Sequence, residues 1–252
     1  MVDGGLRLHG AATRMQFGTT TVRLSSVGTG PPVLLCNGLA TPIESWGPLV
    51  DSLDSFRLIA FDVPGVGDSP PRKGRLSIDG VADIAAAVLD HVEVPRAHVL
   101  GYSWGGAVAQ HLAWRHPHRV DRLVLAATSV GLGAIPGLPW ALVPLLRESF
   151  TASDPGRPRT SPAGLIGQLC AIATWSSLPF LAEVDAPALV LAGTADLVVP
   201  AGNAHLLAGL LRRAEIALVS GVGHRLFSAR ALGVVTDRLA AFLDLGRVTP
   251  DR

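Results

Sequence analysis

Short apolar segments alternate with helix-patterned segments along most of this chain, and no other feature of the sequence limits the fold as strongly. Six apolar runs have the length and composition of buried strands, namely residues 33–36, 58–61, 98–100, 123–126, 188–192 and 216–219. Two intervening segments, Ile78–His91 and Trp104–Arg115, carry apolar residues at helical spacing. Strands connected through helices form right-handed crossovers, so the pattern predicts an α/β fold with a mostly parallel sheet and helices on both faces.

The N-terminal region follows a different pattern. Residues 13–17 and 20–26 have strand-like composition and flank Gly18-Thr19, which predicts an antiparallel hairpin at one edge of the sheet. The hairpin and the six apolar runs together predict a sheet of eight strands. Because α/β sheets commonly use a chain of 252 residues as one unit, we expect a single domain over residues 1–252.

The alternation stops in residues 131–181. This segment is rich in proline, has no strand pattern, and contains Trp140 and Trp175 among leucines and alanines. Long excursions from a compact domain are usually functional, so we expect a small cap or lid, with a decorative insertion as the alternative. The two tryptophans are candidate contacts for an aliphatic substrate, although the same side chains can simply pack on the core.

The composition excludes several classes of partner. Hydrophobic residues make up 48% of the chain, enough for a large core, while the formal net charge is only +1 and basic residues form no run. Nucleic acid is therefore not an expected partner. No apolar run reaches the roughly 18 residues needed to cross a bilayer, and residues 1–13 lack the apolar core of a signal peptide. With only Cys36 and Cys170, we expect reduced thiols and a soluble cytoplasmic protein of undetermined oligomeric state.

A candidate nucleophile lies in Gly101-Tyr102-Ser103-Trp104-Gly105, a G-x-S-x-G sequence between a predicted strand and a predicted helix. A serine at such a sharp strand-to-helix turn is held in strained geometry, and small residues two positions to either side let the turn close. The five-residue pattern is weak alone, and its context makes it specific. The alternative is that Ser103 only caps the helix that follows.

A serine hydroxyl needs a base to take its proton, and an acid to orient that base. Asp196 follows the strand-like run 188–192, and His224 follows the run 216–219. Carboxyl ends of parallel strands meet at one edge of a sheet, where ligands bind. We therefore expect Ser103, His224 and Asp196 to converge as nucleophile, general base and orienting acid.

Other residues compete for these roles less well. Asp62 and Asp68 lie in a segment typical of a turn, in which Asp62 bonds local backbone amides. The residues that follow the run 123–126 include no acid. Among the other histidines, His98 is expected in the core, and five lie on or beside helical segments, namely His91, His111, His116, His118 and His205.

Two backbone N–H groups are candidate oxyanion donors. Trp104 provides one directly after the nucleophile, and Leu39 provides the other in the Asn37-Gly38-Leu39 loop that follows the run 33–36. The same loop makes Asn37 and Gly38 candidate substrate contacts, although an ordinary Asn-Gly turn is the alternative. We expect no metal or cofactor, because the histidines and cysteines lack ligand spacing.

These motifs together resemble the α/β-hydrolase superfamily over nearly the whole chain. More narrowly, four segments look like the intracellular medium-chain poly(3-hydroxyalkanoate) depolymerases, and so does Asn37, where most relatives carry histidine. These segments are residues 61–67, 103–107 with 109–110, 123–128 and 189–193. The resemblance implies the α/β-hydrolase fold and hydrolysis of a storage polyester at a granule surface, with Ser103, Asp196 and His224 as the triad.

The sequence leaves the substrate open. Residues 131–181 look shorter and more divergent than the lid of that family, and the lid is the part that selects the acyl chain. A small-molecule esterase or thioesterase would share the same triad. A peroxidase-like use of the triad has no feature in its favour, and enzymes with a carboxylate nucleophile are disfavoured by Ser103. A non-catalytic binding module on a hydrolase scaffold is the alternative of another class.

Overall fold

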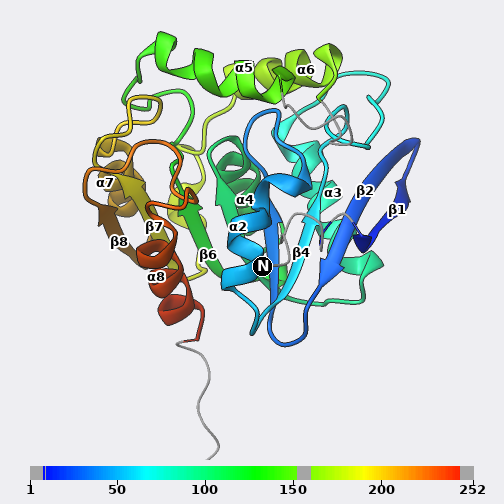
Figure 1. The fold of residues 1–252 in the computed structure, drawn as a ribbon, viewed down its shortest axis with the longest axis horizontal. Coiled ribbons are helices and arrows are strands. Elements are labelled where there is room, and N and C mark those ends of the chain that lie inside the picture. Colours follow the sequence, from blue (N-terminus) through cyan, green and yellow to red (C-terminus); the bar gives the residue numbers. More distant parts are fainter. Residues whose placement is uncertain (1–7, 9, 152–159, 245–252) are drawn as a thin grey trace, which may run out of the picture.

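The computed structural model describes residue 8, residues 10–151 and residues 160–244, and its centre is an eight-stranded sheet (Figure 1). The strand order is β1-β2-β4-β3-β5-β6-β7-β8. The strands are β1 (Ala12–Phe17), β2 (Thr20–Val27), β3 (Pro32–Cys36), β4 (Arg57–Phe61), β5 (Ala97–Tyr102), β6 (Val120–Ala126), β7 (Ala188–Gly193) and β8 (Ala214–Val219). The β1–β2 and β2–β4 pairs are antiparallel and the others are parallel, which confirms the predicted sheet and its N-terminal edge.

Helices cover both faces of the sheet. The α-helices are α2 (Gly47–Ser52), α3 (Ile78–His91), α4 (Trp104–Arg115), α5 (Val143–Thr151), α6 (Pro162–Ala173), α7 (Gly202–Leu210) and α8 (Leu232–Asp244). Short 3-10 segments are η1 (Ile43–Trp46), η2 (Pro117–Arg119), η3 (Pro139–Leu142) and η4 (Leu181–Glu183). Helices α3 and α4 have the predicted bounds, because their apolar periodicity is uninterrupted and a serine or a proline marks the boundary.

Two apolar clusters form the core, one on each side of the sheet. Leu34 of β3 belongs to the cluster beneath α3, α4 and α7, whereas its neighbours Val33 and Leu35 belong to the cluster beneath α2 and α8. Successive side chains of a strand point to opposite faces, so a strand buried on both sides is apolar throughout. This explains why the parallel strands could be recognised as continuous apolar runs.

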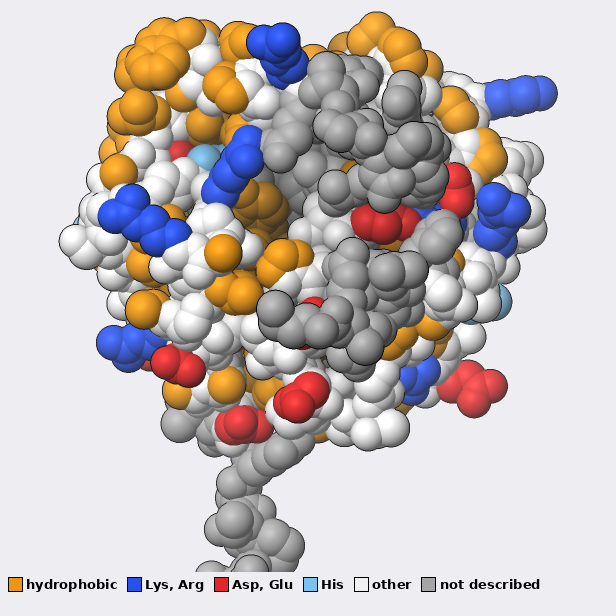
Figure 2. All heavy atoms as spheres, in the orientation of Figure 1, with side chains coloured by type: hydrophobic (Ala, Val, Ile, Leu, Met, Phe, Trp, Pro, Cys, Tyr) orange, Lys and Arg blue, Asp and Glu red, His pale blue; other side chains and the backbone are white. Residues whose placement is uncertain are grey.

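Residues 131–181, the segment expected to form a cap (the insertion), contain η3, α5 and α6. Gly131, at the start of this segment, forms an isolated antiparallel bridge with Ser176, near its end. Helices α5 and α6 lie across one end of the molecule (Figure 1). Hydrophobic side chains gather on the surface at that end (Figure 2). Trp140 of η3, which directly precedes α5, is 63% exposed.

Two smaller expectations concern the thiols and membrane segments. Cys36 is buried, Cys170 is exposed, and both are free thiols, as expected. Within the ranges that the structure describes, no helix has the length and apolarity required to cross a membrane.

Candidate active site

Ser103 lies at the sharp turn between β5 and α4, in strained backbone geometry. Its φ is 53° and its ψ is −117°. A non-glycine residue at positive φ is uncommon and costs free energy, and such residues cluster at functional sites. The strain places the Ser103 side chain at the carboxyl edge of the sheet, facing out of the turn.

The glycines of the motif are required by close backbone packing. A Cβ atom added at Gly105 would lie 2.1 Å from the carbonyl oxygen of Cys36. A Cβ atom at Gly101 would lie 2.6 Å from the Cβ of Ala109. Any side chain at either position would push α4 away from the sheet, so the glycines have the steric role that the sequence predicted.

The structure brings Ser103, His224 and Asp196 into one hydrogen-bonded chain. The distance from His224 Nε2 to Ser103 Oγ is 2.9 Å, and that from His224 Nδ1 to Asp196 Oδ2 is 2.8 Å. The residues come from the ends of β5, β8 and β7. Convergence of the carboxyl ends of three parallel strands explains how side chains 121 and 28 residues apart meet.

The protonation pattern of this chain follows from its partners. Asp196 is buried, and its other oxygen, Oδ1, accepts the backbone N–H groups of Val198 at 2.8 Å and Val199 at 2.9 Å. An ionised carboxylate can only accept hydrogen bonds, so the Nδ1 of His224 must carry the proton that it donates to Oδ2. The Nε2 atom is then free to accept the proton of Ser103 Oγ.

Tyr102, the variable residue before the serine, supports the histidine. Its hydroxyl donates to the backbone carbonyl of His224 at 2.9 Å, and its ring lies 5.6 Å from the imidazole between centroids. No sequence pattern predicts this contact, because it joins residues 122 positions apart. Its only signal was the position of Tyr102 beside Ser103 in the motif.

In the loop after β3, side chains form hydrogen bonds to backbone peptide groups and fix their orientation. The carbonyl oxygen of Gly38 accepts Thr41 Oγ1 at 3.0 Å and Thr41 N at 3.4 Å. Carbonyl and N–H point in opposite directions across a trans peptide, so this contact turns the N–H of Leu39 away from Thr41. Asn37 anchors the loop further by donating to Thr41 O at 2.9 Å and accepting the indole N–H of Trp46 at 2.5 Å.

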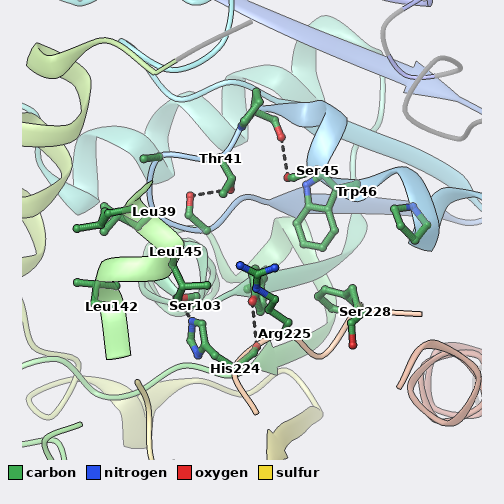
Figure 3. Close-up of a pocket in the computed structure, with 17 residues that line it drawn as sticks. Leu39, Thr41, Ser45, Trp46, Ser103, Leu142, Leu145, His224, Arg225 and Ser228 are labelled. Carbon is green, nitrogen blue, oxygen red and sulfur yellow. Dashed lines mark hydrogen bonds between the residues drawn. The ribbon is translucent and has the colours of Figure 1, made fainter. Parts of the chain in front are cut away.

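A pocket of about 380 Å³ opens beside Ser103 and His224 (Figure 3). Gly38 and Leu39 line it, as do Arg225 and several apolar side chains. The apolar part of the wall includes Trp46, Leu142, Leu145, Leu146 and Phe227. Because the three leucines belong to η3 and α5, the insertion forms one wall of the pocket.

Three of the candidate substrate contacts lie elsewhere. Asn37 is buried behind the loop that it anchors. Trp175 packs in the core and donates its indole N–H to His111 Nδ1 at 3.4 Å, which is the alternative that its sequence context left open. Trp140 is exposed and does not line the pocket. In the part of the chain that the structure describes, no group of three or more His, Cys, Asp or Glu residues is placed to hold a metal ion.

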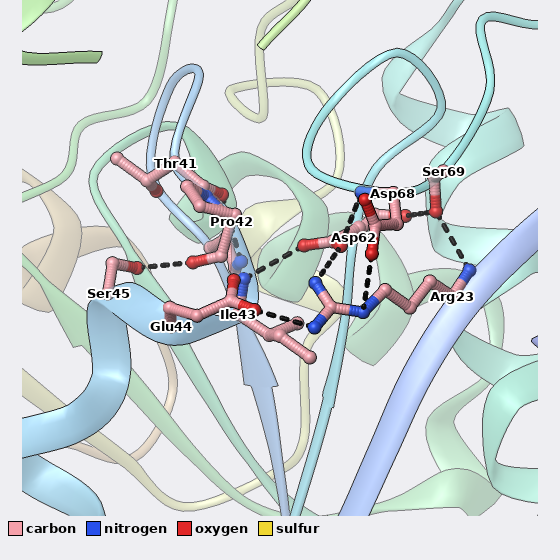
Figure 4. Close-up of polar contacts among 10 residues, drawn as sticks. Arg23, Thr41, Pro42, Ile43, Glu44, Ser45, Asp62, Asp68 and Ser69 are labelled. Atoms are coloured by element: carbon pink, nitrogen blue, oxygen red, sulfur yellow. Dashed lines mark hydrogen bonds and ion pairs between the residues drawn. The ribbon is translucent and has the colours of Figure 1, made fainter. Parts of the chain in front are cut away.

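A buried ionic cluster lies beside the segment that contains Thr41, Pro42 and Ile43 (Figure 4). Asp62 Oδ1 accepts Ile43 N at 2.8 Å, and its Oδ2 accepts Asp68 N at 3.2 Å, so the predicted local amide contacts are confirmed. Arg23 of β2 reaches Asp62 at 3.0 Å and Glu44 at 2.6 Å. No sequence motif signals this ion pair, because its partners come from separate elements. Asp62 is therefore engaged away from the Ser103 chain.

Replacing Arg23 with methionine should destabilise the protein by about 3–5 kcal/mol, because the change leaves the Asp62 carboxylate buried without its cation. Chemical denaturation followed by circular dichroism measures the free energy of unfolding. The control is Arg212→Met, which breaks the exposed ion pair with Asp185 and should cost less than about 1 kcal/mol. Equal effects from the two variants would contradict a stabilising role for the cluster.

The destabilisation caused by Arg23→Met should also depend on pH. Burial raises the pKa of Asp62 to about 6, although Arg23 opposes the shift. The folded-state pKa exceeds the ordinary value of about 4, so the contribution of protonated Asp62 is present at low pH and is lost as pH rises through 6. A neutral Asp62 needs no cation, so the difference between Arg23→Met and the unchanged protein should be smaller at pH 5 than at pH 8.

Comparisons with known proteins identify relatives of this chain. The family model described as the alpha/beta hydrolase fold matches residues 31–160. The chain is 33% identical to a poly(3-hydroxyalkanoate) depolymerase from Ectopseudomonas oleovorans, over 81% of each chain. It is 26% identical to a pimeloyl-[acyl-carrier protein] methyl ester esterase from Nitrosomonas europaea, over 82% of this chain and 94% of that one.

Solved structures show the same fold. A hydrolase from Pseudomonas aeruginosa has a TM-score of 0.80 at 24% identity, covering 94% of this chain and 99% of that one. The enol-lactonase from Burkholderia xenovorans has a TM-score of 0.79 at 24% identity, covering 92% and 99%. At this level of identity the likeness concerns the fold alone.

Proposed function

The chain belongs to the alpha/beta hydrolase fold family, and from that membership we propose that it cleaves carboxylic esters through an acyl-enzyme formed on Ser103. One observation carries the proposal. Asp196, His224 and Ser103 form a continuous hydrogen-bonded chain that ends in an apolar pocket. A binding module would not need this arrangement, whereas acyl transfer depends on it.

In the first step, Ser103 Oγ attacks the carbonyl carbon of the ester while His224 Nε2 takes the hydroxyl proton. The electron pair of the C=O double bond moves to oxygen, and the imidazolium that forms is stabilised by Asp196. Collapse of this intermediate expels the alcohol, which receives the proton from His224. A water molecule, deprotonated by the same nitrogen, then releases the carboxylic acid and restores Ser103.

The negative oxygen of each intermediate needs fixed donors. We assign this role to the backbone N–H groups of Leu39 and Trp104. The N–H of Trp104 is the first of helix α4 and has no acceptor within the helix. The Gly38–Leu39 peptide is oriented by Thr41, so its N–H needs little reorganisation as charge develops.

A storage polyester with aliphatic side chains is the substrate that we favour. The apolar wall from η3 and α5 suits a medium-chain acyl unit, and the insertion would act as the lid that selects it. The depolymerase relative supports this choice, because the likeness extends over 81% of both chains. Action at the surface of a storage granule in the cytoplasm follows as part of the same proposal.

The polyester assignment predicts that the protein clears an emulsion of medium-chain poly(3-hydroxyalkanoate). Turbidity loss is measured for the unchanged protein and for Ser103→Ala, with a short aliphatic nitrophenyl ester assayed in parallel. Clearing that depends on Ser103 is the expected result. Ester cleavage without any clearing would contradict the polyester assignment while retaining the triad.

A small ester or thioester is the second candidate, and the pocket volume is the observation in its favour. A volume of about 380 Å³ is near the lower end of ligand pockets and holds a small acyl group completely. Relative rates on the nitrophenyl ester and the emulsion distinguish the two substrates. For the non-catalytic alternative, failure of a fluorophosphonate to label Ser103 in the folded protein would be the supporting result.

A further inference from the structure

Gln168 of helix α6 is hydrogen-bonded to Ala40, the residue after one proposed oxyanion donor, and to the side chain of Trp104, the other proposed donor. Its side-chain Oε1 accepts the backbone N–H of Ala40 at 2.7 Å, one residue after Leu39. Its backbone carbonyl accepts the indole N–H of Trp104 at 3.0 Å. The Gln168 side chain is fully buried, and its two partners are 128 and 64 residues away in the sequence.

We propose that Gln168 is a positioning residue, through which the insertion holds the two oxyanion donors in register. The inference rests on the proposed function, because it assigns a task to the donors named there. It goes further by giving the insertion a part in the chemistry as well as in forming the pocket wall. Gln168 itself touches neither substrate nor reacting atoms.

The backbone of Ala40 explains why an anchor is needed. Its φ is 57°, a left-handed conformation that is costly for a residue with a side chain. Residues of the insertion bind both backbone groups of Ala40. Gln168 Oε1 accepts the Ala40 N–H, and the hydroxyl of Thr160 donates to the Ala40 carbonyl at 2.7 Å. Without the Gln168 acceptor, the Ala40 N–H would be buried and unpaired, and rotation of the Leu39–Ala40 peptide would relieve that cost.

Such a rotation changes ψ of Leu39, so that Thr41 alone holds the Gly38–Leu39 peptide, which carries the Leu39 N–H. Thr41 fixes the peptide on one side of Leu39, and Gln168 fixes the peptide on the other. The Leu39 N–H is held from both sides only when both Thr41 and Gln168 make these hydrogen bonds. The bond to the Trp104 indole ties the second donor residue to the same point of α6.

The Gln168 amide has one further property that fits this role. Oε1 accepts the Ala40 N–H, so the two ends of the amide are assigned and Nε2 is the donor end. Within the described residues, this buried Nε2 has no hydrogen-bond partner. An unpaired buried donor costs free energy, so an apolar side chain would serve a purely packing role at this position better.

The test replaces Gln168 with methionine, which keeps the length of the side chain and removes the acceptor. Oxyanion donors act on the charge that develops in the transition state, so kcat should fall by about tenfold or more while KM changes by less than about twofold. The probe is para-nitrophenyl butyrate. The rate of Ser103 labelling by a fluorophosphonate should fall in parallel, because that reaction also develops a negative oxygen.

Two further variants separate positioning from general stability. Ser161→Ala removes the hydroxyl that donates to Gly65 O and accepts from Gly164 N at the start of α6, so it loosens the helix without touching Ala40. It should lower Tm and leave kcat within about twofold. Gln168→Glu retains an acceptor at the same distance in either protonation state, so it should restore kcat relative to methionine even though it lowers Tm.

The inference is overturned if Gln168→Met keeps kcat within about twofold of the unchanged protein. It is also overturned if Gln168→Met and Ser161→Ala have equal Tm and show the same fall in kcat. If Gln168→Met does not fold, Thr160→Val releases the other side of Ala40. A kcat of Thr160→Val equal to that of the unchanged protein would then overturn the inference. Substantial turnover by Ser103→Ala would instead refute the proposed function, so the two failures are distinguishable.

Discussion

Replacing Ser103 with alanine is expected to lower kcat on a short nitrophenyl ester by about 10⁴- to 10⁶-fold, by analogy with other serine hydrolases. The change removes the nucleophile and the only hydroxyl that faces His224 Nε2 in the hydrogen-bonded chain. The fold should persist, because alanine accepts the positive φ at this turn no worse than serine does. Initial rates, single-turnover labelling and thermal melting together measure the effect.

The matched control is Ser129→Ala, at the carboxyl end of the neighbouring strand β6. Its hydroxyl accepts the backbone N–H of Gly131 at 3.3 Å and does not line the pocket. Activity should therefore stay within about threefold of the unchanged protein. If Ser103→Ala retained more than about 1% of the original kcat, the nucleophile would have to be another residue.

The sheet and the convergence of Ser103, His224 and Asp196 could be predicted from sequence, because both depend on local patterns. Strands buried on both faces appear as apolar runs, and α3 has a continuous apolar stripe between Ser77 and Val92, so its bounds were recovered. Ser103, Asp196 and His224 could be chosen as candidates because each follows a predicted strand. Topology then brought them together, since a parallel sheet gathers strand ends at one edge.

Contacts between distant elements could not be predicted in the same way. Gln168 and Arg23 make buried hydrogen bonds to residues on other elements, and neither lies in a recognisable motif. Trp140 and Trp175 were candidates by residue type alone, and burial separates them: one is 63% exposed and the other is 8% exposed in the core. Side-chain placement within the insertion depends on packing, which a single sequence does not encode as a pattern.

Replacing Asp196 with asparagine should lower kcat by up to about 10⁴-fold with little change in Tm, as in other triads that lose the acid. The hydrogen bonds of Asp196 give the reason. Oδ1 accepts the N–H groups of Val198 and Val199, so the oxygen of asparagine must occupy that position. Its NH₂ group then faces His224 Nδ1 and donates to it. The imidazole is forced to carry its proton on Nε2, which can no longer accept the proton of Ser103.

The defect expected in Asp196→Asn is therefore a wrong tautomer of His224, and the matched control is a carboxylate that does not contact His224. Asp68→Asn changes a carboxylate in the segment that first competed for the acid role, and its side chain is 41% exposed. Its kcat should stay within about threefold, because it does not contact His224. In Asp196→Asn, a nitrogen-bound proton NMR resonance from His224 should move from Nδ1 to Nε2. Activity of Asp196→Asn within about tenfold of the unchanged protein would assign the orienting acid to a different residue.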